Sequence, residues 1–323
     1  MRAGVSTATV SRALRNHPNV TDGTRRKVLD AAAALSYVAN PNASRLASGR
    51  SGTVGVLAPI LTSWYTSEVL AGVEEVLAGE HFDLLIGTAT TTVRDRVLNG
   101  DAAFRQRVDG VLLVDVFCEE SGAIALTRHG LPAVVVGERL GAVTSMSVDN
   151  RLGAGLAAEH LVTLGHQRIA MISGGADPLI AASVPAQRAA GFVAALGRHG
   201  ITLPDRYRAD GGFSIAGGRR AAHRLLALRQ PPSAVFCMSD EMAFGVLQAA
   251  VERGVAVPSQ LSVVGFDDHS VSGAFGLTTV RQPVRQMGRV AARALLEQLA
   301  NPTGPSHHAI PVDLVERSST GPA

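Results

Sequence analysis

The chain has 323 residues, of which 46% are hydrophobic and 18% charged, a composition that excludes a disordered protein and allows two or three domains. No apolar run reaches the roughly 18–20 residues that span a bilayer, and no apolar signal region opens the chain, so we expect a cytoplasmic protein without a membrane partner. The net charge of +3 is uneven: residues 1–50 carry eight Lys or Arg against two Asp, and the remainder carries 22 basic against 25 acidic residues. This distribution predicts a polyanionic partner for the head alone.

Two short helices are predicted in the head. Ser6 is a suitable N-cap for a helix from Thr7 to about Leu14, and Thr21 for a second helix from Asp22 to about Ser36. In the first helix Val10 and Leu14 form the apolar side. The opposite side carries small and polar side chains that would fit a major groove, where an arginine reaches a guanine edge or a phosphate; these are Thr7, Ala8, Ser11 and Arg12. The alternative is a solvated basic face.

A polar, basic stretch joins the head to the rest of the chain. Asn40 is a good N-cap and Pro41 suits a first helical position, so residues 41–48 could form two turns of helix. Eight residues do not recover the cost of helix nucleation, which requires about 12–15. We therefore expect a helix that orders only against a partner, with an ordinary linker as the alternative.

From Thr53 onward apolar runs alternate with helical periods. The runs are continuous and β-branched, as parallel strands buried on both faces are, and the pattern restarts once. This predicts an α/β fold with two doubly wound parallel-sheet lobes and a ligand site beyond the carboxyl ends of the strands. Expected strands are 53–60, 82–89, 110–116, 132–138, 145–149, 168–173, 234–239, 261–265 and 310–315; expected helices are 67–79, 93–107, 119–129, 151–164, 185–199, 215–229, 241–253 and 284–300.

Several side chains near strand ends are candidate ligand contacts. Trp64 and Tyr65 form an adjacent aromatic pair in the loop after the first strand, and aromatic faces pack on the C–H face of a sugar or stack on a base. Arg188 opens an otherwise small and apolar helix, and its five donors suit a polyol or a carboxylate. Asp240 and Asp267 end two strands and could accept paired hydrogen bonds from hydroxyls. The alternatives are core anchors for the aromatic pair, a surface arginine, and a helix cap for Asp240.

The catalytic and cofactor motifs that we considered are incomplete. Gly153-Ala-Gly155 lacks the third glycine of a dinucleotide loop, and Ser173-Gly-Gly175 has no nearby lysine for a phosphate loop, because Lys27 is the only lysine. His307 and His308 are expected to be solvated. Cys118 and Cys237 lie in apolar runs and are expected to be buried thiols rather than a disulfide. We predict neither an enzyme nor a cofactor or metal site.

Blocks in both parts of the chain resemble the LacI-type bacterial transcription regulators. They are AGVSTATVSRALRN and VTDGTRRKVLDAAAALSYVANPNASRLASGRSGTVGVL, then VDNRLGAGLAAEHLVTLGHQRIAMISG, QRAAGF, PPSAVFCMSDEMAFGVLQAAVERGVAVPSQLSVVGFDD, LTTVRQP and VERSST. The resemblance implies a helix-turn-helix head at 1–36, a hinge helix at 37–52 and a periplasmic-binding-protein-like body at 53–323. It also implies three crossings between lobes, which we place near 163, 280 and 308, so that lobe 1 is 53–163 with 281–308 and lobe 2 is 164–280 with 309–323.

The resemblance also assigns roles to individual residues. It makes Ser6–Leu14 the recognition helix, Leu46 a wedge in the minor groove and Ala43 a contact with the dimer mate. It makes Arg188 the effector-binding arginine and Asp267 the ligand-facing member of its pair. Further implied contacts are an aromatic pocket residue, a motif at the lobe junction that could equally be an N-cap, and a residue at the rim of the cleft; these are Phe213, Asp149 with Asn150, and Gln282.

The predicted function is a repressor that binds a palindromic operator as a homodimer and responds to a small effector between its lobes. A sugar is the expected effector, and a nucleobase is the alternative. A pure sugar-binding protein without DNA binding is the other class. The family pattern has a further helix before Ala3-Gly-Val-Ser6, so we expect either an upstream start or weak DNA binding.

Overall fold

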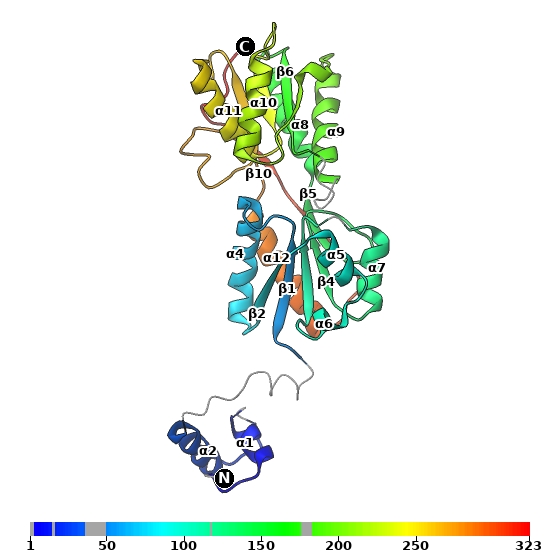
Figure 1. The fold of residues 1–323 in the computed structure, drawn as a ribbon, viewed down its shortest axis with the longest axis vertical. Helices are drawn as coiled ribbons and strands as arrows, with labels where there is room; N and C mark the ends of the chain where they lie inside the picture. Colours follow the sequence, from blue (N-terminus) through cyan, green and yellow to red (C-terminus); the bar gives the residue numbers. More distant parts are fainter. Residues whose placement is uncertain (1–2, 15–16, 36–49, 117, 176–182) are drawn as a thin grey trace. The chain divides into compact units, whose positions relative to one another are not determined.

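The computed structural model describes residues 3–14, 17–35, 50–116, 118–175 and 183–323 and forms two compact units, Met1–Gly52 and Thr53–Ala323 (Figure 1). The hinge residues predicted from the sequence, Asn40, Ala43 and Leu46, lie outside the described residues. In the described part of the chain no helix combines the length and the apolar character needed to cross a membrane.

The head contains the two expected helices, α1 (Thr7–Leu14) and α2 (Asp22–Ala34). The Thr21 hydroxyl accepts a hydrogen bond from the backbone N–H of Thr24 and caps α2, as predicted. Ala13, Val20 and Val28 form a small buried core between the helices. The head therefore has its own core, built from one apolar side of each helix.

Lobe 1 is a parallel six-stranded sheet in the order β11-β5-β4-β3-β1-β2. Alternate strand residues serve opposite faces: Val56 packs on the side of α4 and α12, and Leu57 on the side of α5 and α7. The elements are β1 (Thr53–Ala58), α4 (Trp64–Gly79), β2 (Asp83–Thr88), α5 (Thr91–Leu98), α6 (Ala102–Arg105), β3 (Gly110–Val114), α7 (Glu120–Arg128), β4 (Ala133–Val136), β5 (Thr144–Val148), α12 (Val284–Ala300) and β11 (His307–Ile310).

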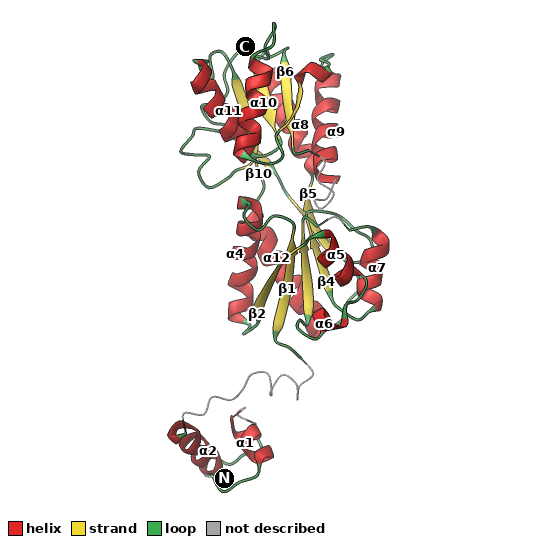
Figure 2. Cartoon of the chain, in the orientation of Figure 1, coloured by secondary structure: helices red, strands yellow, loops and turns green. Residues whose placement is uncertain are grey.

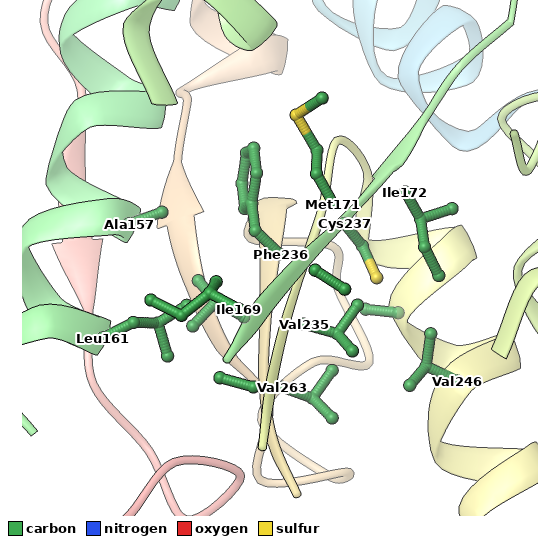
Figure 3. Close-up of a cluster of buried hydrophobic side chains, with 14 of the residues drawn as sticks. Ala157, Leu161, Ile169, Met171, Ile172, Val235, Phe236, Cys237, Val246 and Val263 are labelled. Carbon is green, nitrogen blue, oxygen red and sulfur yellow. The ribbon is translucent and has the colours of Figure 1, made fainter. Parts of the chain in front are cut away.

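Lobe 2 has a second six-stranded sheet, ordered β12-β10-β9-β8-β6-β7, in which β12 alone runs antiparallel to its neighbour. Its strands are drawn yellow in Figure 2, where β6 and β10 are labelled. Ala157 and Leu161 of α8 and Val246 of α11 reach the core from opposite sides of the strands (Figure 3). The elements are α8 (Asn150–Thr163), β6 (Ile169–Ser173), α9 (Ser183–Arg198), the 3-10 helix η1 (Asp205–Tyr207), β7 (Arg208–Asp210), α10 (Ile215–Leu226), β8 (Ala234–Cys237), α11 (Asp240–Arg253), β9 (Ser262–Asp267), β10 (Thr278–Arg281) and β12 (Asp313–Val315).

The fold class predicted from the sequence is confirmed, but some boundaries were wrong. Helix α8 packs on α9 and on strands of lobe 2, so the first crossing lies at Asp149 rather than near residue 163. The expected strand 310–315 is two strands in different sheets, β11 and β12, and the third crossing lies between them. The expected helix 93–107 is interrupted between Leu98 and Ala102, and the short edge strand β7 was not expected.

Helix pairs cross closely on the sheet faces because glycine removes side chains at the contacts. In lobe 1 a Cβ on Gly288 of α12 would stand 2.2 Å from the Val69 carbonyl oxygen of α4. In lobe 2 a Cβ on Gly191 of α9 would stand 2.2 Å from the Arg151 oxygen of α8. These distances lie inside van der Waals contact, so the helix pairs need glycine at these positions.

Candidate functional site

A pocket lies between the two lobes, at the carboxyl ends of the strands. Lobe 1 contributes the segments after β1, β3 and β4, and lobe 2 contributes α8, α9, the start of α11 and the end of β9. Seven residues proposed from the sequence line this pocket: Trp64, Tyr65, Asn150, Arg188, Phe213, Asp267 and Gln282. Beside them stand apolar side chains that the sequence did not single out, namely Ile60, Val148, Val184 and Met287.

Arg188 is the centre of a buried polar network in lobe 2. Its Nε donates to the Asn150 side-chain oxygen at 2.8 Å, one terminal nitrogen donates to the Met238 carbonyl, and the same nitrogen lies 3.9 Å from Asp267 Oδ1. Its guanidinium also stacks over the Phe266 ring, 3.6 Å from the centroid. Only 5% of Arg188 is exposed, so the alternative of a surface arginine was wrong.

The Asp267 carboxylate is held from a second direction. Its Oδ1 accepts a hydrogen bond from the Gln282 side-chain amide at 2.6 Å, and the Gln282 backbone N–H donates to the Asp267 carbonyl. Gln282 is 3% exposed, so it lies inside the site and not at its rim. Burial raises the pKa of Asp267 well above its usual value, Arg188 opposes this rise, and Asp240 adds to it. Asp267 is therefore held by Gln282, which follows β10, and lies beside Arg188 of α9.

Trp64 and Tyr65 are the first two residues of helix α4 rather than a loop, because Ser63 caps the helix by accepting from the Thr66 N–H at 3.2 Å. The Trp64 backbone N–H points to Glu241 Oε1 at 3.5 Å, and its ring lies 4.7 Å from the His269 ring, both in lobe 2. The buried indole nitrogen of Trp64 has no hydrogen-bond partner among the described residues. Trp64 thus joins the two lobes and presents an unpaired donor.

Two candidate residues do not line the pocket. Asp149 is exposed, and its carboxylate caps α8 by accepting from the Leu152 N–H at 2.9 Å, so the structure favours its alternative role. Asp240 is fully buried and accepts from the His269 N–H and from the hydroxyls of Ser272 and Thr279. Asp240 therefore ties the segment after β9 and strand β10 to α11, and Ser239 rather than Asp240 caps the helix.

Two acidic pocket residues were missed by the sequence interpretation. Asp115 follows β3, and the rule of carboxylates at strand ends, which selected Asp240 and Asp267, would also have selected it. Burial raises the pKa of Asp115 to about 7, Arg188 lowers it and Glu138 raises it further. Glu241 lies in the first turn of α11, and burial raises its pKa as well. No pattern around Glu241 distinguishes it from a helix-start acid that complements the dipole.

The exposed face of α1 in the head matches the predicted DNA-contacting set. Ser6, Thr7, Ala8, Ser11 and Arg12 are all exposed, and the buried side of α1 faces α2. The Ser6 hydroxyl accepts from the Thr9 N–H at 3.2 Å and caps the helix, as expected. The helix therefore leaves a continuous small and polar surface with one arginine.

Comparisons with known proteins agree with this two-part organisation. Residues 1–40 match the model of bacterial regulatory proteins of the lacI family, and residues 158–320 match the model of the periplasmic binding protein-like domain. The HTH-type transcriptional repressor CytR of Escherichia coli K12 is 34% identical over 326 aligned positions, which cover 99% of this chain and 94% of that protein.

Solved structures give the same result for the fold. The lac repressor dimer bound to operator and the anti-inducer ONPF has a TM-score of 0.87 at 27% identity, covering 99% of this chain and 97% of that one. The transcriptional regulator CelR in complex with cellobiose has a TM-score of 0.73 at 28% identity, covering 98% and 97%. The chain belongs to the lacI family of bacterial regulatory proteins.

Proposed function

We propose that this chain is a transcriptional repressor that binds a palindromic operator as a homodimer and releases or engages it in response to a sugar bound between the lobes. The observation that carries the proposal is the pocket around Arg188, because residues of both lobes line it. A ligand that contacts both walls stabilises one lobe arrangement over others, and this differential binding is what a regulatory effector requires.

The head supports the DNA-binding part of the proposal. Its +6 charge suits a phosphate backbone, and the exposed face of α1 offers short side chains that let a helix approach base edges, with Arg12 as the donor for a guanine or a phosphate. We assign Asn40, Ala43 and Leu46 to a hinge helix that orders on the operator, with Leu46 as the minor-groove wedge. CytR and the lac repressor, which this chain resembles over most of its length, are named as repressors.

The composition of the pocket argues for a sugar without negative charge. Its lining contains one guanidinium and three carboxyl groups, from Asp115, Glu241 and Asp267, so a phosphate or carboxylate ligand would meet one cation and three groups that repel an anion when they ionise. Hydroxyl groups suit this lining, because they donate to carboxylates and accept from arginine. The CelR structure holds cellobiose, a neutral sugar.

A nucleobase effector is the second candidate, and the aromatic lining favours it. Trp64 and Phe213 both face the pocket, and aromatic rings stack on flat bases as readily as they pack on the C–H face of a sugar. The two classes are separated by a thermal-shift screen of mono- and disaccharides against nucleobases and nucleosides, because a ligand that binds only the folded chain raises Tm.

Arg188→Lys tests the site itself. Lysine keeps the positive charge beside Asp267 but loses the planar fork of donors, so we expect at least about tenfold weaker effector binding. Binding to an operator duplex selected from random sequences should be unchanged when no effector is present. The matched control is Arg198→Lys on the same helix, whose side chain is 62% exposed and pairs with Glu159. Equal effector affinities for both variants would refute the assignment of Arg188.

A further inference from the structure

The charged groups of the pocket do not balance. One guanidinium, that of Arg188, faces three carboxyl groups, and the only lysine of the chain, Lys27, lies in the head. Burial raises the pKa of all three carboxyl groups, of Asp115, Glu241 and Asp267, and so favours their neutral forms. A bound ligand can correct the imbalance by supplying a positive charge.

The Arg188 charge is already engaged by its own lobe. Asn150, the Met238 carbonyl and the Phe266 ring fix its position, and Asp267 lies 3.9 Å from its Nη1. Asp267 in turn accepts from Gln282. Arg188 and Asp267 therefore lie beside each other on the wall of lobe 2, each held by other residues of that lobe, and no second cation lines the pocket among the described residues.

Asp115, on the wall of lobe 1, is the carboxyl group left over. Its carboxylate makes no hydrogen bond to any other described residue, whereas Glu241 accepts from the Trp64 backbone. The Asp115 backbone has φ 50°, a left-handed conformation that is uncommon for non-glycine residues, although Asp adopts it more often than most. A Cβ on the neighbouring Gly137 would stand 2.1 Å from Asp115 Oδ1, so glycine at 137 makes the room that this carboxylate occupies. The charged groups that act on Asp115 are Arg188 and Glu138.

The Trp64 indole N–H is a second group without a hydrogen-bond partner, and it predicts a hydrogen-bond acceptor elsewhere on the ligand. The buried indole nitrogen of Trp64 needs an acceptor, and a hydroxyl or ring oxygen supplies one. The pocket thus lacks a strong donor for Asp115 and an acceptor for Trp64, both on the side of lobe 1.

We infer that the effector is an amino sugar, whose protonated amine binds the Asp115 carboxylate and whose hydroxyl or ring oxygen accepts from Trp64. The inference rests on the proposed function and names the subclass of sugar. The ammonium group would replace the missing cation, and a charge-assisted N–H···O bond is about twice as strong as a neutral one. Because burial holds the pKa of Asp115 at about 7, the arriving ammonium also draws this carboxyl into its ionised form near neutral pH.

The test measures binding by calorimetry on the full chain at pH 7 with two matched series. The first is D-glucosamine, D-glucose and N-acetyl-D-glucosamine, and the second is D-galactosamine, D-galactose and N-acetyl-D-galactosamine. In at least one series we expect the amine to bind at least about tenfold more tightly than the parent sugar and the acetylated form. Asp115→Asn should remove this preference.

Asp101→Asn is the matched control, since Asp101 is a carboxyl group in the same lobe that pairs with Arg96, does not line the pocket and is not among the charged groups that act on Asp115. This variant should keep the preference for the amine. The inference is overturned if neutral sugars bind as tightly as their amines, if Asp115→Asn keeps the preference, or if Asp101→Asn loses it equally. Tight binding of neutral sugars would leave the proposed function intact, whereas a chain that binds none of the sugars, including cellobiose, contradicts both.

Discussion

The two lobes share a strand order, apart from the antiparallel direction of β12, but differ in how completely helices cover their sheets. In lobe 2 long helices cover both faces of the sheet, α8 with α9 and α10 with α11, and all six residues of β9 are buried. In lobe 1 only one face has a long pair, α4 with α12, whereas α5, α6 and α7 have 8, 4 and 9 residues. The edge strand β2 also leaves Ile86 45% exposed.

The halves of the pocket follow the same division. In lobe 2 the polar side chains already make hydrogen bonds within the protein: Arg188 donates to Asn150, and Asp267 accepts from Gln282. On the side of lobe 1, the indole nitrogen of Trp64 and the Asp115 carboxylate lack hydrogen-bond partners among the described residues. In the proposed site, lobe 2 would therefore be the preorganised half, and lobe 1 would supply the groups whose environment changes most on binding.

The largest expected effect concerns packing. A Cβ on Gly245 of α11 would stand 2.1 Å from the Ile215 carbonyl oxygen, so Gly245→Ala forces two helix backbones apart. We expect a loss of about 3 kcal/mol in the free energy of unfolding, with Tm lowered by about 6–12 °C. The matched control is Gly122→Ala on α7, where the nearest atom is the Leu98 Cδ1 methyl at 3.2 Å and the alanine gains helix propensity. Equal shifts of Tm for both variants would contradict the need for glycine where α10 and α11 cross.

The second effect is a pH dependence that comes from lobe 1. An unfolded Asp titrates near pH 3.9, and folding raises the pKa of Asp115 to about 7, so the folded state binds the proton more tightly. Its contribution to stability is full below about pH 4 and is lost as the pH rises through about 7. Asp115→Asn removes this loss, so the variant should be more stable than the wild type at pH 8 by about 2 kcal/mol and no more stable at pH 4.

Urea unfolding at both pH values measures the Asp115 effect. The quantity to compare is the free energy of unfolding of the variant minus that of the wild type at each pH. Burial also lowers the pKa of His166 and His269, so these groups make both proteins more stable as the pH rises, and the subtraction removes their effect. A variant that gains the same stability at pH 4 and pH 8 would show that Asp115 acts through shape and not through its charge.

The sequence allowed the strands to be predicted because their apolar runs are continuous. The run Leu261–Gly265 has no polar residue but Ser262, and it became β9 with every residue buried. Short strands were harder, since β11 and β12 have four and three residues and are separated only by Pro311 and Val312. Nothing in so short a stretch shows that its two halves join different sheets.

The sequence selected carboxylates near strand ends but not the directions in which their side chains point. Asp115, Asp240 and Asp267 all come at or just after strand ends, yet only Asp115 and Asp267 of these three line the pocket. The Asp240 carboxylate instead accepts hydrogen bonds inside lobe 2, from His269 and Thr279. The directions of the three carboxylates depend on backbone angles, such as φ 50° at Asp115 and 132° at Asp267, and on which neighbours offer donors. Sequence spacing encodes neither property, so the strand-end rule finds candidates without ranking them.

The smallest expected effect tests whether lobe 1 depends on a helix cap. Ser63→Ala removes the N-cap of α4. Thr90→Ala removes the equivalent N-cap of α5, because the Thr90 hydroxyl accepts from the Val93 N–H. Each substitution should cost about 1 kcal/mol of unfolding free energy. Only Ser63→Ala should weaken binding of the tightest sugar found in the screen, by about three- to tenfold, because the first turn of α4 carries Trp64 and Tyr65.

Since Ser63 also lines the pocket, Ser63→Asn, which keeps a capping oxygen, should restore most of the affinity if the cap is the cause. If Ser63→Asn binds the sugar as weakly as Ser63→Ala does, the hydroxyl contacts the ligand directly, and lobe 1 is more preorganised than its unpaired groups suggest.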